Sequence, residues 1–227
     1  MRFAINVGNG VLTEYDTQTG KAEGITVEIA RDIARKLDLK CELVIYNSAR
    51  KVVEDATRNI WDIAFIARDA KRADAISFTE PYILIEANYL VRKGAPFHTN
   101  KDVDQPGIKI AAGKGAAYEL YLSRNLKHAK IIHTDGRLSV TDMFLEHNLD
   151  VAAGIRQSLE NAAATHKNLR VLDEPFMAIE QAMATPKMNS DISAYINNYV
   201  QTALKTGFIT RLRDQFGKSQ VKMPTTQ

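Results

Sequence analysis

The sequence lacks most of the features that identify a specialised class of protein. It has one cysteine among 227 residues, so no disulfide can form within the chain and the thiol does not reveal the compartment. No apolar run approaches the roughly 18–20 residues that span a bilayer. No group of His and Cys residues has the spacing of a zinc site, so we expect no metal and no cofactor.

Charge is also not concentrated anywhere along the chain. The net charge is +3, with Lys and Arg scattered among Asp and Glu, and the pI is about 8.9. A nucleic-acid-binding protein normally shows a basic block or an aromatic-rich basic stripe, and neither is present. We therefore expect no nucleic acid as a partner. The balance of 45% hydrophobic and 25% charged residues is ordinary for a globular protein of one or two domains.

The chain opens directly on a predicted strand. Residues 2–7 are mostly apolar, which leaves no charged and apolar leader to be cleaved. Either a leader has been removed, which fits a periplasmic protein, or the protein stays in the cytoplasm. The sequence leaves both possibilities open.

The first third of the chain alternates between strand and helix patterns. Isoleucine or leucine recurs at every fourth position of residues 25–37, which predicts an amphipathic helix over residues 23–37. Apolar residues 41–46 and 63–66 predict strands, and residues 48–59 predict a second helix. This βαβαβ order implies a parallel sheet with right-handed crossovers.

The remaining elements follow the same rules. Predicted strands are residues 88–92, 108–112, 131–133, 171–173 and 179–184. Predicted helices begin near residue 117 and cover residues 139–147, 192–206 and 208–216. Residues 80–82 (Glu-Pro-Tyr) predict a turn, and residues 221–227 predict a frayed tail.

The stretch DIAFIARDAKRADAISFTEPY, residues 62–82, joins a buried strand to a charged loop. Open α/β sheets hold ligands beyond the carboxyl ends of their strands, where such a loop lies. The pattern D-[ILV]-A-x(n)-R-A-x-x-[IV]-x-F-[ST]-x-P-Y resembles the type II periplasmic solute-binding proteins of the amino-acid type. Partial motifs at residues 24–30, 113–117, 148–154 and 204–217 resemble the same family, in the same order.

The resemblance implies an α/β fold of two Rossmann-like lobes joined by two hinge strands, the type II periplasmic binding protein fold. Lobe 1 is expected at residues 1–90 plus 184–227, and lobe 2 at residues 91–183. The hinge strands are expected near residues 88–92 and 180–185. The ligand would lie in the cleft between the lobes and stabilise the closed state.

Within the central stretch, the resemblance implies that Arg72 grips the carboxylate of the ligand, and a planar guanidinium suits this role. Ala67 and Asp69, on the same loop, are candidate ligand-binding residues with it. The alternative is a salt bridge between Arg72 and Asp69 or Asp74 on an exposed loop. Because we expect the loop at the surface, Arg72→Ala should cost about half a kcal/mol or less in stability.

The turn at residues 113–117 precedes a predicted helix, where free N–H groups and the helix dipole favour an anion. This motif is weak by itself, because many α/β proteins have glycine here for packing. The resemblance implies that the N–H groups of Gly115, Ala116 and Ala117 complete the grip on the carboxylate. The family usually has Thr or Ser at Ala116, so a hydroxyl contact is lost.

The chain departs from the family after Asp150. The family usually has an acid five residues later, which binds the ammonium group of the ligand, and this chain has Ile155 there. Arg156 follows, and with Arg68 it would add positive charge if both side chains face the ligand. Each is otherwise an ordinary surface arginine.

Three further residues are candidates for ligand contacts. Glu14, in the other lobe, is a candidate to replace the missing acid. Glu14→Gln should therefore weaken the binding of a cationic ligand by about 1 kcal/mol or more. Phe65 and Tyr118 are candidates for the aromatic residues between which the family stacks its ligand. Phe65 is equally compatible with the core.

The resemblance implies a monomeric binding subunit of an ABC importer, with a membrane permease as its partner. Its ligand would be a small carboxylate-bearing solute: amino-acid-like, opine-like or an organic acid. The alternative is a cyclohexadienyl dehydratase-like enzyme on the same fold, for which Glu14 is the only general acid we name. A sensing domain of a receptor is the third possibility. We expect a binding protein without catalytic residues.

Overall fold

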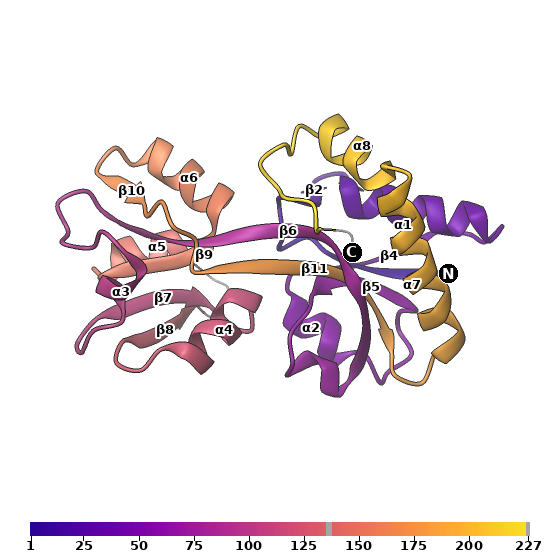
Figure 1. Cartoon of the computed structure of the whole chain (residues 1–227), viewed down its shortest axis with the longest axis horizontal. Helices are drawn as coiled ribbons and strands as arrows, with labels where there is room; N and C mark the ends of the chain where they lie inside the picture. Colours follow the sequence, from indigo (N-terminus) through magenta and orange to yellow (C-terminus); the bar gives the residue numbers. More distant parts are fainter. Residues whose placement is uncertain (135–137, 226–227) are drawn as a thin grey trace. The chain divides into compact units, whose positions relative to one another are not determined.

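The computed structural model describes residues 1–134 and 138–225, and it divides the chain into two compact units (Figure 1). Unit 1 comprises Met1–Leu84 and Glu180–Gln227, and unit 2 comprises Ile85–Ile179. The chain passes from one unit to the other within two long strands, β6 (Ile76–Arg92) and β11 (Met177–Pro186). Each unit contains both helices and strands.

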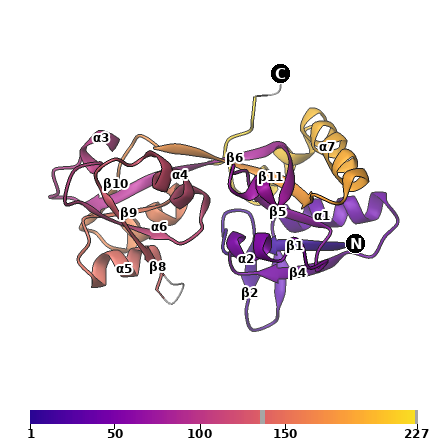
Figure 2. The ribbon, with the colours of Figure 1, turned by 90° about the horizontal axis from the view of Figure 1, so that it is seen from below.

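Unit 1 is built on a sheet with the strand order β4-β1-β5-β11-β6. Its other strands are β1 (Arg2–Asn6), β4 (Glu42–Tyr46), β5 (Ile63–Ala67) and a separate hairpin of β2 (Glu14–Asp16) and β3 (Lys21–Glu23). Its helices are α1 (Ile25–Lys36), α2 (Ala49–Glu54), the short 3-10 helix η1 (Arg72–Asp74), α7 (Ser190–Lys205) and α8 (Phe208–Gln215). β1 pairs in parallel with β4 on one side and β5 on the other, and Figure 2 shows the N-terminus at the start of β1 beside β4.

The strand order places the first two helices on opposite faces of this sheet. The chain leaves β1 for β4 through α1, and then returns past β1 to β5 through α2. Two right-handed crossovers in opposite directions cover opposite faces. In Figure 1, α2 lies below the strands of unit 1, whereas α1 and α8 lie above them.

On each face of the unit 1 sheet, a buried aromatic side chain donates a hydrogen bond. On the α2 face, Trp61 is 1% exposed, and its indole N–H donates to the Val52 carbonyl oxygen at 3.1 Å. On the other face, the Tyr199 hydroxyl of α7 donates to Asp32 of α1 at 2.8 Å. These bonds satisfy polar atoms that packing removes from water.

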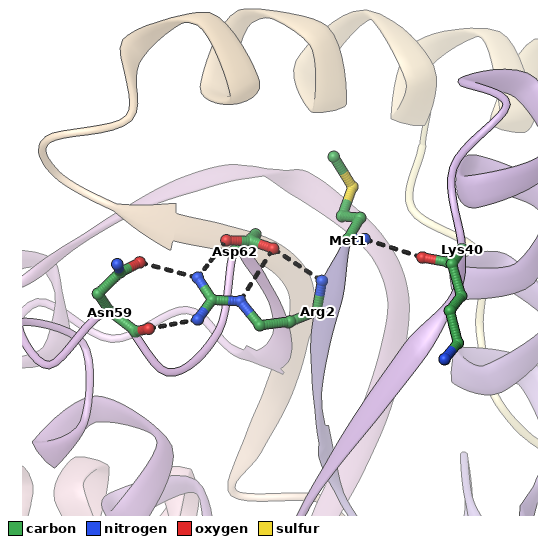
Figure 3. Close-up of polar contacts among 5 residues, drawn as sticks. All are labelled: Met1, Arg2, Lys40, Asn59 and Asp62. Atoms are coloured by element: carbon green, nitrogen blue, oxygen red, sulfur yellow. Dashed lines mark hydrogen bonds and ion pairs between the residues drawn. The ribbon is translucent and has the colours of Figure 1, made fainter.

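An arginine at the start of β1 fastens the strand to the segment before β5 (Figure 3). The Arg2 guanidinium and the Arg2 backbone N–H both donate to Asp62, each at 2.7 Å, and the side chain also bonds Asn59. The Met1 ammonium donates to the Lys40 carbonyl oxygen at 2.8 Å, next to β4. This end of the sheet, at the amino ends of the parallel strands, is therefore held by a polar network.

Unit 2 repeats the arrangement with the strand order β9-β7-β8. Its elements are α3 (Asn100–Val103), β7 (Lys109–Gly113), α4 (Ala117–Asn125), β8 (Lys130–Thr134), α5 (Val140–Glu146), β9 (Val151–Ile155), α6 (Arg156–Thr165) and β10 (Leu169–Val171). β7 pairs in parallel with both β8 and β9, and β6 pairs antiparallel with β9. Phe144 of α5 and Leu159 of α6 are buried against Ala111 and Ala152 of the sheet. In Figure 1, α6 lies above these strands and α4 below them.

Several sequence predictions about local structure are wrong. Residues 80–82 are not a turn but continue β6. β6 continues through Pro81, which has no N–H to donate, and just before it the Thr79 side-chain hydroxyl accepts the Met183 backbone N–H at 3.1 Å. The second helix, predicted over residues 48–59, has only the six residues of α2. The β2–β3 hairpin, α3 and α6 were not predicted.

The predicted frayed tail is also partly wrong. Val221 is 2% exposed, and Lys222 forms an antiparallel bridge with Leu84. The Leu84 N–H donates to the Lys222 carbonyl oxygen at 2.8 Å. Residues 226–227 of this prediction lie outside the described residues.

Candidate functional site

In unit 1, Ala67, Arg68, Asp69 and Arg72 lie together at the carboxyl end of β5. The strand order reverses at β1, so the loops after β1 and β5 leave the same edge of the sheet side by side. This is the position at which open α/β sheets bind ligands. Ala67 ends β5, and Arg68, Asp69 and Arg72 follow it directly.

Arg72 is almost completely buried on this loop. It is 4% exposed, and its Nη1 donates to the Ala67 carbonyl oxygen at 2.8 Å. Burial disfavours the charged guanidinium and lowers the pKa of Arg72 to about 10, whereas the nearby Asp69 opposes this shift. The side chain therefore remains a cation at neutral pH, with little of the hydration that offsets its charge in water.

This position corrects one expectation. Arg72 is not an exposed loop residue, so replacing it by alanine would also remove a buried side chain and leave a cavity. The expected cost of half a kcal/mol or less assumed an exposed side chain and no longer applies. Tests of its role require a replacement of similar volume, such as methionine.

Arg68 is engaged with two acidic residues of its own unit. Its Nη1 lies 2.9 Å from Glu80 Oε2, and its Nε lies 3.7 Å from Glu180 Oε2. Its side chain is 37% exposed and lies at the rim of an open pocket of about 600 Å³, together with Asp69. Arg68 is accessible, but much of its charge is already balanced.

Phe65 and Glu14 have different surroundings. The Phe65 ring is 3% exposed and lies between Phe3, at 6.4 Å, and Tyr82, at 6.3 Å, so it is part of the core of unit 1. Glu14 is exposed on the β2–β3 hairpin, and its Oε1 lies 3.0 Å from Lys218 Nζ. Of these two, only Glu14 presents its side chain to solvent.

The predicted turn of unit 2 occupies the matching place in its own sheet. β7 pairs in parallel with β9, and the strand order reverses at β7. The turn after β7 is therefore next to Arg156, which follows β9. Gly115 has φ of 75°, in the left-handed region that glycine adopts at low cost.

The amides of this turn bond within unit 2. The Gly115 N–H donates to Glu119 Oε2 at 2.8 Å, and the Ala116 N–H donates to the Gly113 carbonyl oxygen at 3.0 Å. Ala117 begins α4. The anion that the turn was predicted to bind is, at Gly115, the chain's own carboxylate.

Glu119 was not identified from the sequence. It is 5% exposed, and it also accepts a hydrogen bond from Ser123 at 2.7 Å and lies 3.0 Å from His133 Nε2. Burial alone would raise the pKa of Glu119, but the hydrogen bonds from Ser123, His133 and Gly115 outweigh it and lower the pKa. Glu119 is at the third position of α4, where a capping box places its acid, but the N-cap is Ala116 rather than Ser or Thr, so the sequence signal was incomplete.

Tyr118 lies beneath the same turn. It is 9% exposed, its hydroxyl accepts the Gly113 N–H at 3.3 Å, and burial raises its pKa to about 12. A Cβ added at Gly113 would lie 2.9 Å from the Tyr118 hydroxyl, so this contact requires glycine. The ring of Tyr118 therefore supports the turn from inside unit 2.

Arg156 has three partners in unit 2. Its Nη1 lies 3.0 Å from Glu86 Oε2, its Nε lies 2.8 Å from Glu160 Oε1, and Nη1 also donates to the Asp173 carbonyl oxygen at 3.2 Å. The hydrogen bond that Arg156 donates to Glu160 is the main cause of the raised pKa of Arg156. Like Arg68, it is a cation whose charge is matched inside its own unit.

Two classes of site are absent from the residues that the structure describes. Within residues 1–134 and 138–225, no group of three or more His, Cys, Asp or Glu side chains is placed to hold a metal ion. No helix in the same part of the chain has the length and hydropathy to cross a bilayer.

Comparisons with known proteins agree with this architecture. The L-cystine-binding protein TcyJ of Escherichia coli (strain K12) is 24% identical over 224 residues, covering 92% of this chain and 79% of that protein. The cyclohexadienyl dehydratase of Pseudomonas aeruginosa is 23% identical over 201 residues, covering 86% of this chain and 74% of that protein.

A solved structure confirms the predicted fold class. The putative ABC transporter binding component of Wolinella succinogenes, complexed with lysine, matches with a TM-score of 0.79 at 22% identity. The match covers 95% of this chain and 94% of that one. The model of the family described as bacterial extracellular solute-binding proteins, family 3, matches residues 7–219. The chain therefore belongs to family 3 of the bacterial extracellular solute-binding proteins.

Proposed function

We propose that this protein binds a small solute with a carboxylate group and delivers it to the membrane permease of an ABC importer. The observation that carries the proposal is the Arg72 guanidinium, 4% exposed at the carboxyl end of β5. A buried cation is costly unless an anion compensates it. Asp69 already favours the charged guanidinium, and a ligand carboxylate would add two parallel hydrogen bonds to it.

We propose that Arg72 and its loop hold the carboxylate. The turn at Gly115, Ala116 and Ala117 is a second candidate contact for the ligand. The Gly115 N–H already bonds Glu119, so the turn offers a fixed shape more than a set of free donors. Most of the charge recognition therefore falls to unit 1.

The ligand is proposed to be an amino acid or a related compound. Relatives named above bind cystine or were solved with lysine. This chain has Ile155 where the family places the acid that meets the ammonium group, and we propose that Glu14 supplies that charge instead. If the ligand is instead an organic acid without an ammonium group, Glu14 has no role in binding it.

The similarity to a dehydratase supports a second candidate function, an enzyme on the same fold. Acid catalysis near neutral pH requires a carboxyl whose pKa is raised. Among the described residues, every carboxyl with a shifted pKa is lowered, as for Asp32, Asp62, Asp104 and Glu119. This favours a binding protein, which we propose acts in the periplasm.

A thermal-shift screen with matched pairs tests the proposal. Each carboxylate, whether an amino acid, an opine-like conjugate, a dicarboxylate or prephenate, is paired with its carboxamide where one exists. A ligand at 100 times its Kd adds about 2.7 kcal/mol of stability. We expect a shift with at least one carboxylate, none with its amide, and none with the Arg72→Met variant. A shift that the amide or the variant reproduces would contradict the proposal.

A further inference from the structure

An open pocket of about 600 Å³ lies in unit 1 and is lined in part by the β5–η1 loop. Arg72 does not line it, although its neighbours Asp69 and Ala73 do. The walls are this loop, the beginning of β6, and residues near the two ends of the unit 1 part of β11. We call it the Lys187 pocket.

The floor of the Lys187 pocket is apolar. Ile76 is 1% exposed and belongs to the core on the α2 face, and Phe78 packs against the same core while remaining partly accessible. Ala70 and Ala73 add small apolar surfaces. A ligand with a hydrocarbon or aromatic body would cover this floor and remove apolar surface from water.

The charges at the rim are unequally balanced. Arg68 is paired with Glu80 at 2.9 Å and lies 3.7 Å from Glu180. Asp69 accepts the Lys71 N–H at 2.9 Å and favours the charged form of Arg72.

Lys187 is different from the other charged residues of the rim. It is exposed, and its ammonium forms no ion pair with any residue in the described part of the chain. Glu180 is seven residues away along an extended segment, about 20 Å at ~3.3 Å per residue, and cannot neutralise it. Lys187 is therefore the cation of the rim that is left to pair with a ligand carboxylate.

We propose that the Lys187 pocket is a second binding site, for a small carboxylate with an apolar body. The body would lie on Ile76 and Phe78, and the carboxylate would pair with Lys187. The volume is within the ~300–1,000 Å³ that small-molecule sites occupy. Arg72, the residue proposed to hold the solute, does not line the pocket, although Arg68 and Asp69 of the same loop do, so an Arg72 variant distinguishes the two sites.

The test uses 4-phenylbutyrate as the probe, with 4-phenylbutyramide and 4-phenylbutylamine as its neutral and cationic counterparts. Titrations are followed by amide NMR of the full chain. We expect 4-phenylbutyrate to shift the amides of Ile76, Ser77, Phe78 and Lys187. The amide should bind at least about fivefold more weakly, and the amine should not bind.

Variants separate this site from the solute site. Lys187→Gln should weaken 4-phenylbutyrate at least about fivefold, whereas Lys205→Gln, a change of another exposed lysine of unit 1, should not. Arg72→Met should leave probe binding unchanged. Equal binding of the amide, an unchanged affinity in Lys187→Gln, or shifts confined to other residues would overturn the proposal.

Discussion

The two units present the same architectural position with opposite electrostatics. In unit 1 the loop after β5 carries a guanidinium that is 4% exposed, with a pKa lowered to about 10 by burial. In unit 2 the turn after β7 has its Gly115 amide bonded to the carboxylate of Glu119, which is itself held by Ser123 and His133. The first loop holds a desolvated cation that Asp69 partly offsets, and the second holds an amide that bonds a carboxylate of its own helix.

The difference separates two ways of building a binding surface. A desolvated cation gains most when an anion arrives, because the charge interaction is stronger where water is excluded. A turn whose donors are already bonded gains little from the same anion, but it keeps its shape when the ligand is absent. We therefore expect the Arg72 loop, rather than the turn at residues 113–117, to determine the affinity for a carboxylate.

Replacing Arg72 by methionine should have the largest effect on affinity for the ligand. The change keeps the side-chain volume but removes the cation and its two charge-assisted hydrogen bonds, which are worth about 1.5–3 kcal/mol each. We expect affinity for the carboxylate ligand to fall at least about 100-fold by calorimetry. Arg156→Met is the matched control from unit 2, and a similar loss there would contradict the asymmetry.

Replacing Glu119 by alanine should reduce stability more than affinity. The change leaves Gly115, Ser123 and His133 without their acceptor, at a cost of about 2 kcal/mol in the free energy of unfolding. We expect ligand affinity at 25 °C to change less than about fivefold. Glu160→Ala, an exposed acid in the same unit, should cost about 0.5 kcal/mol or less in urea unfolding.

The pH dependence of stability provides a further test of the role of Glu119 in unit 2. The pKa of Glu119 is lower in the folded chain than its unfolded value of about 4.3, so its stabilisation is present above that pH. It is lost as the pH falls through the folded pKa. Urea unfolding of the wild type should weaken between pH 5 and pH 3 more than that of Glu119→Gln, and parallel curves would show that Glu119 does not contribute.

The smallest effect is expected at Glu14. Its ion pair with Lys218 is exposed, so Glu14→Gln should change stability by less than about 0.5 kcal/mol. We expect affinity for an ammonium-bearing ligand to fall by about 1 kcal/mol, roughly fivefold. Lys218→Gln breaks the same ion pair but keeps the Glu14 carboxylate, so it should not weaken the binding of that ligand. Equal affinities in wild type and Glu14→Gln would exclude Glu14 from the site.

The architecture was predictable where hydrophobic periodicity is regular. The fourfold spacing of residues 25–37 predicted α1, and the alternation of strands and helices predicted the parallel sheets. Prediction failed where a local signal had two physical meanings. Pro81 indicates a turn in isolation, but the extended backbone of β6 continues through it, because the fixed φ of proline is also compatible with a strand.

The candidate site was predictable in its loops but not in its side-chain environments. The β5–η1 loop and the turn at residues 113–117 lie where strand ends of a doubly wound sheet place them. The burial of Arg72 depends on packing between segments distant in sequence, so no local pattern reveals it. The Glu119 contact with His133 likewise joins a helix to a separate strand, although its first-turn position was visible.

The most direct measurement is a double-mutant cycle by calorimetry between Arg72 and the ligand carboxylate. The wild type and Arg72→Met are each titrated with the solute from the screen and with its carboxamide. We predict a coupling free energy of about 3 kcal/mol, because the guanidinium and the carboxylate bind each other directly, so that removing either group removes the same interaction. Additive losses, with coupling near zero, would show that Arg72 does not hold the carboxylate and would contradict the account.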